Sequence, residues 1–176
     1  MSCSTPEASR AAKGMLAAVV TVSDSCSRGE KTDLSGPAVA EALQRRGFEI
    51  VESAVVADER DEIQKKLMAL CSAARLVVTT GGTGIAPRDV TPEATLAVCD
   101  RLVEGIGEHM RAAGMRKTRF AALSRGVCGI RGASLVLNLP GSPAGAVESL
   151  EAVIDLLPHA LELLAGKTEH NGSSLR

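Results

Sequence analysis

Short apolar runs and longer amphipathic stretches alternate along most of this chain. Four runs rich in Val, Leu, Ile and Ala are too short for helices and predict β-strands. They are Leu16–Ser23, Glu49–Val56, Leu76–Thr80 and Leu135–Leu139. Five stretches with helical spacing predict α-helices, the last one interrupted at Pro158. They are Leu34–Arg46, Glu59–Ala74, Pro92–Leu102, Gly105–Met115 and Ala144–Leu164.

Strands that alternate with helices indicate βαβ units, in which helices cover both faces of a parallel sheet. We therefore expect an α/β fold, a three-layer α/β/α sandwich with a mainly parallel sheet. The chain has no Trp or Tyr and only two Phe, so aliphatic side chains must fill the core, as they do in buried parallel sheets. Its 176 residues fit one domain. We expect that domain over residues 14–166, with a disordered arm at 1–13 and a flexible tail at 167–176.

Composition excludes several classes of function. A net charge of −1 and the near absence of aromatic residues argue against a nucleic-acid-binding protein. No apolar run approaches the roughly 18–20 residues that span a bilayer, and the N-terminal residues do not resemble a secretory signal. The five cysteines are scattered, without a C-x-x-C pair, as is typical of reduced thiols. We expect a soluble, cytoplasmic protein that binds neither nucleic acid nor membranes.

Three loops are expected at one edge of the sheet, because parallel sheets bind ligands at the carboxyl ends of their strands. Ser23 and Asp24 follow the first strand, Gly81-Gly82-Thr83-Gly84 follows the third, and Gly141 and Ser142 follow the fourth. Convergence of these loops would form a ligand site.

The glycine loop has two interpretations. Glycines let backbone N–H groups approach an anion closely, and the hydroxyls of Thr79, Thr80 and Thr83 would add donors. The loop lacks the Lys-Ser/Thr of a Walker A motif and the spacing of a dinucleotide-binding motif. Taken alone, the glycines fit a phosphate-binding loop and a simple tight turn equally well.

The residues that follow favour phosphate binding. Pro87-Arg88-Asp89 places a cation and a carboxylate beside the loop, and Thr91-Pro92 suits the N-cap and first position of a helix, whose open N–H groups attract anions. Ser142-Pro143 repeats this arrangement before the last helix. Structural explanations remain for each residue, since Asp89 can shape the loop and Thr91 and Ser142 can simply cap helices. No G-x-S-x-G motif is present, which argues against a hydrolase nucleophile.

Three carboxylates are expected near the same edge: Asp24, Asp58 and Asp89. Mg²⁺ takes one or two carboxylates together with phosphate oxygens and water, so a cluster of this kind would suit nucleotide transfer. Asp24 and Asp58 are also explained by a turn and by a helix cap.

Three segments carry a resemblance to a known family. TVSDSCSRGEKTDLSG, TTGGTGIAPRDVTPEAT and LSRGVCGIRGASLVLNLPGSPAGAVE occur in this order. The chain resembles the molybdenum-cofactor biosynthesis family of MogA, MoaB and the gephyrin G domain, over roughly residues 17–164. The GGTG–PRDVTPEAT segment is the most specific. The chain departs from the family at Ala57-Asp58-Glu59, where we expect Pro before the aspartate.

The resemblance implies Mg²⁺-dependent transfer of AMP from ATP to the terminal phosphate of molybdopterin, by a homotrimer or hexamer whose product passes to a molybdenum-insertion partner. It implies that Asp58 and Asp89 are catalytic and hold the metal. The remaining positions that it implicates bind the nucleotide, line the site or face the pterin. They are Gly81, Gly82, Thr83 and Gly84 for the nucleotide, Ser23, Asp24, Gly141 and Ser142 for the lining, and Ser124 and Arg125 for the pterin.

Other functions remain open. One is a MoaB-type protein that binds molybdopterin and nucleotide with weak or no adenylyltransferase activity. Another is a non-catalytic scaffold, as the gephyrin relative partly is, and a third is a generic nucleotide-binding regulator. We prefer the enzyme, because three converging loops with acidic residues are what nucleotide transfer requires.

Overall fold

The computed structural model describes residues 15–167. The expected arm at 1–13 and, apart from Lys167, the expected tail lie outside the described residues. Six strands form one sheet in the order β2-β1-β3-β6-β5-β4. Their bounds are β1 Met15–Val22, β2 Phe48–Val56, β3 Leu76–Thr80, β4 Arg101–Leu102, β5 Cys128–Arg131 and β6 Ser134–Leu139.

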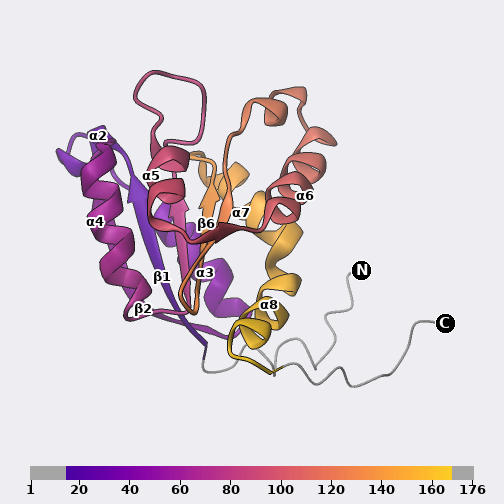
Figure 1. Ribbon diagram of the computed structural model, residues 1–176. Coiled ribbons are helices and arrows are strands. Elements are labelled where there is room, and N and C mark those ends of the chain that lie inside the picture. Colours follow the sequence, from indigo (N-terminus) through magenta and orange to yellow (C-terminus); the bar gives the residue numbers. More distant parts are fainter. Residues whose placement is uncertain (1–14, 168–176) are drawn as a thin grey trace.

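The four strands β2, β1, β3 and β6 are parallel, and β5 runs antiparallel to both β6 and β4. Helices cover both faces of this sheet, as Figure 1 shows. The helical elements are α2 Asp24–Ser27, α3 Ser35–Arg45, α4 Arg60–Cys71, α5 Thr91–Val98, α6 Glu104–Met115, η1 Arg119–Leu123, α7 Pro143–Val153, η2 Ile154–Leu156 and α8 Leu157–Leu164. The prediction of a three-layer α/β/α sandwich with a mainly parallel sheet is confirmed.

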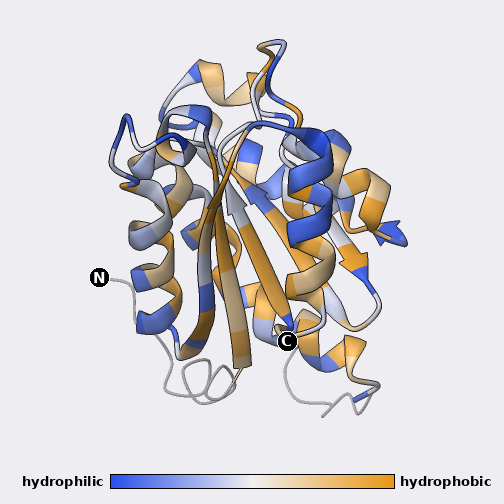
Figure 2. Ribbon diagram, turned by 90° about the vertical axis from the view of Figure 1, so that its left-hand side faces the viewer, coloured by the Kyte–Doolittle hydropathy of each residue, from blue (hydrophilic) through white to orange (hydrophobic). Residues whose placement is uncertain are grey.

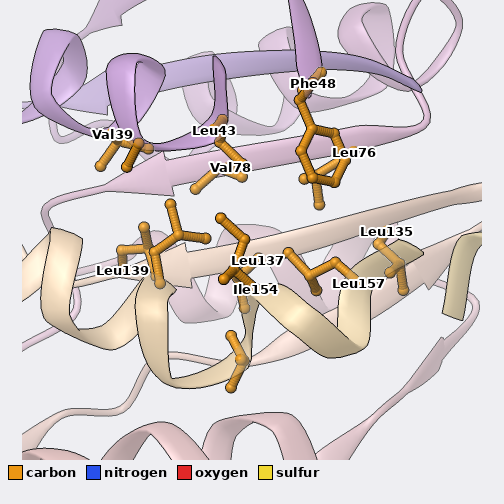
Figure 3. Close-up of a cluster of buried hydrophobic side chains, with 14 of the residues drawn as sticks. Val39, Leu43, Phe48, Leu76, Val78, Leu135, Leu137, Leu139, Ile154 and Leu157 are labelled. Atoms are coloured by element: carbon orange, nitrogen blue, oxygen red, sulfur yellow. The ribbon is translucent and has the colours of Figure 1, made fainter. Parts of the chain in front are cut away.

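The core is aliphatic on both faces of the sheet. One cluster packs α3, α6, α7 and α8 on the strands, and its side chains include Leu43, Val78 and Leu137 (Figure 3). The other packs α4 and α5 on the opposite face, with Ile63, Leu67 and Leu70 of α4 buried. Figure 2 shows this pattern as hydrophobic strands between helices whose hydrophilic residues face outward. Parallel strands buried on both faces require such continuous apolar runs.

The antiparallel edge was not predicted. The helix expected over Pro92–Leu102 ends at Val98, and Arg101–Leu102 forms β4 instead. The backbone turns extended at Cys99, and Asp100 N then donates to Ile130 O at 2.7 Å. Pairing with β5, which is distant in the sequence, therefore overrides the helical pattern.

The last predicted helix consists of three pieces. The helix α7 ends at Val153, the 3-10 turn η2 follows, and α8 begins at Leu157, with Pro158 in its first turn. A proline lacks the N–H that would bond the carbonyl four residues earlier, but it fits a first helical turn. The interruption consequently precedes Pro158. Within residues 15–167 no helix is long and apolar enough to cross a membrane.

Candidate active site

The sheet register brings the predicted loops together. Thr21 of β1 pairs with Thr80 of β3, which pairs with Leu139 of β6. These three parallel strands therefore end at the same level, and the loops that follow them meet at one edge. Beyond this level Gly81 N donates to Leu139 O at 3.1 Å. The predicted convergence is confirmed.

Glycines let the loop backbones touch. Gly81 has φ +101° and Gly82 has φ +65°, a region that side chains disfavour. A Cβ on Gly81 would overlap the carbonyl oxygen of Val22, and a Cβ on Gly141 would lie 3.3 Å from the Cα of Gly81. The three loops are thus in contact through their backbones.

The glycine loop has unused backbone donors. The N–H groups of Gly82, Thr83 and Gly84 donate to no acceptor within residues 15–167, whereas the Gly81 N–H is already bonded to Leu139. Consecutive free N–H groups in such a turn form an anion-binding concavity. The N–H groups available to an anion therefore begin at Gly82.

The two predicted catalytic carboxylates lie beside these glycines. A Cβ on Gly82 would be 3.2 Å from Asp58 Oδ1, and one on Gly84 would be 2.7 Å from Asp89 Oδ2. Both aspartates line a cavity of about 470 Å³. Its other lining residues include Ser23, Lys31, Gly81, Gly82 and Gly141. Asp89 also accepts from Ala86 N at 2.9 Å, so it shapes its own loop as well.

Asp24 differs from the other two carboxylates. Asp24 N donates to Asp58 Oδ2 at 2.8 Å, and Asp58 N donates to Asp24 Oδ1 at 3.0 Å. Arg88 binds both oxygens of Asp24 and also Glu59. Asp58 accordingly does not cap α4, whose N-cap is Glu59. These bonds hold the ends of β1 and β2 together.

The pKa values of Asp24 and Asp58 are shifted in opposite directions. The hydrogen bond from Arg88 lowers the pKa of Asp24, with help from the Asp58 N–H. Burial raises the pKa of Asp58, and the neighbouring Asp24 and Asp89 add to this effect. Within residues 15–167 no group of three or more Asp, Glu, His or Cys side chains is arranged to hold a metal. The three aspartates lie near one another as expected, but of the three only Asp58 and Asp89 line the cavity.

Of the two residues predicted as helix N-caps, one has this role. Thr91 is not the N-cap of α5, which is Val90. The buried Thr91 hydroxyl donates instead to Gly81 O at 2.9 Å. Ser142 is an N-cap as predicted, since it accepts from Gly145 N at 3.2 Å.

The sequence analysis did not identify the buried amide of Asn138. Asn138 Nδ2 donates to the hydroxyls of Thr79 and Thr95 at 3.0 and 2.9 Å. The Thr80 hydroxyl donates to Pro140 O at 2.7 Å. Thr79 and Thr80 thus bond within the protein, and the expectation that their hydroxyls serve the anion is wrong.

A second cavity, of about 610 Å³, lies on the other side of the glycine loop. Thr83, Gly84, Ser124 and Ser142 line it, and Gly141 lines both cavities. Most of its other lining residues come from α6, η1 and α7. Two adjoining cavities of this size suit two ligands that meet at the loop.

Arg125 is not among the residues that line either cavity. Its guanidinium donates to Gly84 O at 2.7 Å and to Asp89 O at 2.6 Å, and it pairs with Glu93. Its own N–H donates to Thr83 O at 2.8 Å. Ser124 therefore lines the second cavity, whereas Arg125 bonds to both ends of the loop.

Comparison with known proteins identifies the family. The family described as a probable molybdopterin binding domain matches residues 18–159. The chain belongs to this family. The chain is 45% identical to a molybdopterin adenylyltransferase of Helicobacter pylori J99, over 84% of this chain and 86% of that protein. It is 41% identical to the molybdopterin adenylyltransferase of Escherichia coli K12, over 84% of each.

A solved structure agrees. The molybdopterin biosynthesis enzyme MoaB of Thermus thermophilus matches this chain with a TM-score of 0.80 and 52% identity. The match covers 87% of this chain and 98% of that one. The resemblance to the MogA and MoaB family is therefore confirmed, while the roles of individual site residues stay predictions.

Proposed function

We propose that this protein is a molybdopterin adenylyltransferase, which transfers AMP from ATP to molybdopterin and releases pyrophosphate. The observation that carries this proposal is the row of free N–H groups at Gly82, Thr83 and Gly84, flanked by Asp58 and Asp89. Relatives at 41% and 45% identity over most of the chain bear the name of that enzyme. Donors for an anion next to two carboxylates are what nucleotidyl transfer needs.

The two cavities suggest where the substrates bind. The nucleotide phosphates would lie in the 470 Å³ cavity, against the free N–H groups and the two aspartates. The pterin would occupy the 610 Å³ cavity beside Ser124. Because Gly141 lines both, the molybdopterin phosphate and the α-phosphate of ATP would meet at the glycine and Pro-Gly-Ser-Pro loops.

Mg²⁺ fits this site with substrate phosphates as further ligands. Asp58 and Asp89 provide carboxylate oxygens on one cavity, and Mg²⁺ usually takes one or two carboxylates together with phosphate oxygens and water. Asp24 is bonded to Arg88 and is not needed. When bound, the ion would neutralise the charge of the phosphates.

The reaction is a displacement at phosphorus. An oxygen of the molybdopterin phosphate attacks the α-phosphorus of ATP, a new P–O bond forms, and the bond to the β-phosphate oxygen breaks so that pyrophosphate leaves. The attacking phosphate is already anionic near neutral pH, so no general base is required. The N–H groups from Gly82 to Gly84 would bind the phosphate oxygens, and Arg125 would keep their loop in place.

A product assay tests this function. Purified protein with ATP, Mg²⁺ and molybdopterin is expected to form adenylylated molybdopterin and pyrophosphate, measured by chromatography and mass spectrometry. Absence of product, under conditions in which the Escherichia coli enzyme forms it, would contradict the proposal. Such a result would favour the MoaB-type alternative, a binding protein with weak or no activity. The 52% identity to MoaB is the observation that favours this alternative.

We also propose that the protein is a homotrimer, or a hexamer, in the cytoplasm. Phe120 and Leu123 are exposed at the second cavity, which is consistent with a surface that another subunit covers. Light scattering coupled to gel filtration tests the assembly, and a monomeric mass would contradict it.

A further inference from the structure

Arg88 links the loop before α5 to the ends of β1 and β2. Its Nε and Nη2 donate to the two oxygens of Asp24 at 2.6 and 3.0 Å, and Nη2 also donates to Glu59 at 2.7 Å. In Figure 1 the loop that leads into α5 rises beyond the end of the sheet. One cation thus connects three segments around the nucleotide cavity.

The surroundings of Arg88 are strongly acidic. Asp24, Asp58, Glu59 and Asp89 lie together here, and within residues 15–167 Arg88 is the basic residue that forms ion pairs with this group. A triphosphate brings further negative charge to the same cavity. Carboxylates repel phosphates, and a cation of the protein lowers this repulsion. Lys31 lines the cavity, and Arg88 is the cation bound to the carboxylates themselves.

Arg88 can exchange its carboxylate partners for the oxygens of a phosphate. The planar guanidinium binds two oxygens of a carboxylate in the same forked geometry in which it binds two oxygens of a phosphate. More than half of the side chain is exposed, and exposed ion pairs contribute little to stability. Arg88 precedes Asp89, which lines the cavity, and Asp24 lies between Ser23 and Ser25, which also line it. Arg88 itself does not line the cavity, but its guanidinium shares Asp24 Oδ1 with the backbone N–H of Asp58, which does.

We propose that Arg88 binds the β- and γ-phosphates of ATP, and that Glu59 and Asp24 hold its side chain until the nucleotide arrives. Glu59 then acts as a competitor of the triphosphate for the same guanidinium. This inference rests on the proposed function, because ATP is its ligand. It predicts that the two members of one ion pair have opposite effects on ATP affinity.

Calorimetric titration of the full chain with ATP and with AMP, in Mg²⁺ buffer without molybdopterin, tests the proposal. Arg88→Gln is expected to weaken ATP binding about tenfold or more, as for loss of a charge-assisted contact, and to change AMP binding less than about twofold. Glu59→Gln removes one of the two carboxylates that compete for the guanidinium, while Asp24 still binds it, and is expected to strengthen ATP binding about two- to fivefold. Arg28→Gln and Glu30→Gln are the matched controls, since they break a nearby exposed pair of the same kind.

The outcomes separate this inference from the proposed function. Equal weakening of ATP and AMP in Arg88→Gln, or unchanged or weaker ATP binding in Glu59→Gln, would show that Arg88 only supports the loop. A wild type that binds no ATP overturns both this inference and the proposed enzyme. A wild type with the expected binding pattern but no adenylylated product leaves the role of Arg88 intact and removes the proposed reaction.

Discussion

Replacing Gly82 with alanine tests the close contact between the glycine loop and its neighbours. Gly82 has φ +65°, and a Cβ there would overlap Thr91 Oγ1 and lie 3.2 Å from Asp58 Oδ1. The Thr91 hydroxyl is buried and donates to Gly81 O at 2.9 Å. The added methyl group must therefore displace this hydroxyl, and it also presses on a predicted catalytic carboxylate.

The expected loss of stability for Gly82→Ala has two parts. A left-handed backbone costs an L-residue roughly 1–2 kcal/mol. Breaking the buried Thr91 bond, with its partners left unsatisfied, costs roughly a further 1–3 kcal/mol. Gly132→Ala is the matched control, because Gly132 has φ +55° and its added Cβ would meet no atom within 4 Å. The control should lose only the first part.

Urea unfolding of both variants measures these losses from the transition midpoint at constant slope. We expect Gly82→Ala to be less stable than Gly132→Ala by about 1–3 kcal/mol. ATP affinity should also fall in Gly82→Ala and remain unchanged in Gly132→Ala. Equal losses of stability in the two variants would refute the argument that Gly82 is required by contact and not only by its backbone angle.

Further predictions concern the supports of the site. Ser142→Ala removes the side-chain bond to Gly145 N and should cost about 1 kcal/mol in urea unfolding, whereas an unchanged midpoint would show that the cap is unimportant. Asn138→Leu leaves two buried threonine hydroxyls without their partner and should cost roughly 2–4 kcal/mol, and a loss below that of Ser142→Ala would contradict this expectation. Arg125 lowers the pKa of Glu93 through a hydrogen bond, so the pair stabilises the fold above the unfolded pKa of Glu, near 4.5, and loses this effect as pH falls through the lower folded value. As the pH falls below about 5, the melting temperature of Glu93→Gln should therefore decrease less than that of wild type. If the melting temperatures of the two proteins depend on pH in the same way, the pair does not contribute to stability.

The sequence was sufficient for the parallel part of the fold. The strands β1, β3 and β6 are continuous apolar runs, and each is followed by a loop with glycine or small polar residues. Local patterns of this kind specify both the element and its buried position. The antiparallel edge could not be predicted in the same way, because β4 has two residues and exists through pairing with the distant β5.

The candidate site was predicted in outline but not in its contacts. The structure brings Asp58, Asp89 and the glycine loop to one cavity, because the loops that follow parallel strands meet at one edge of the sheet. The prediction that Thr91 is the N-cap of α5 was wrong, because its hydroxyl donates to Gly81 O across the loop. The role of Arg125 depends on carbonyl groups about 40 residues earlier in the chain. Bonds between distant segments leave no local pattern in the sequence.

The most direct test compares wild type with Asp89→Asn in the formation of adenylylated molybdopterin from ATP and molybdopterin. The asparagine oxygen can still accept from Ala86 N, so the free energy of unfolding should stay within about 0.5 kcal/mol of that of wild type. We predict product from wild type and a rate lower by about 100-fold or more in Asp89→Asn, since the neutral amide is a poorer ligand for the Mg²⁺ that would neutralise the phosphates. Equal rates in the two proteins, or no product from folded wild type, would contradict the account.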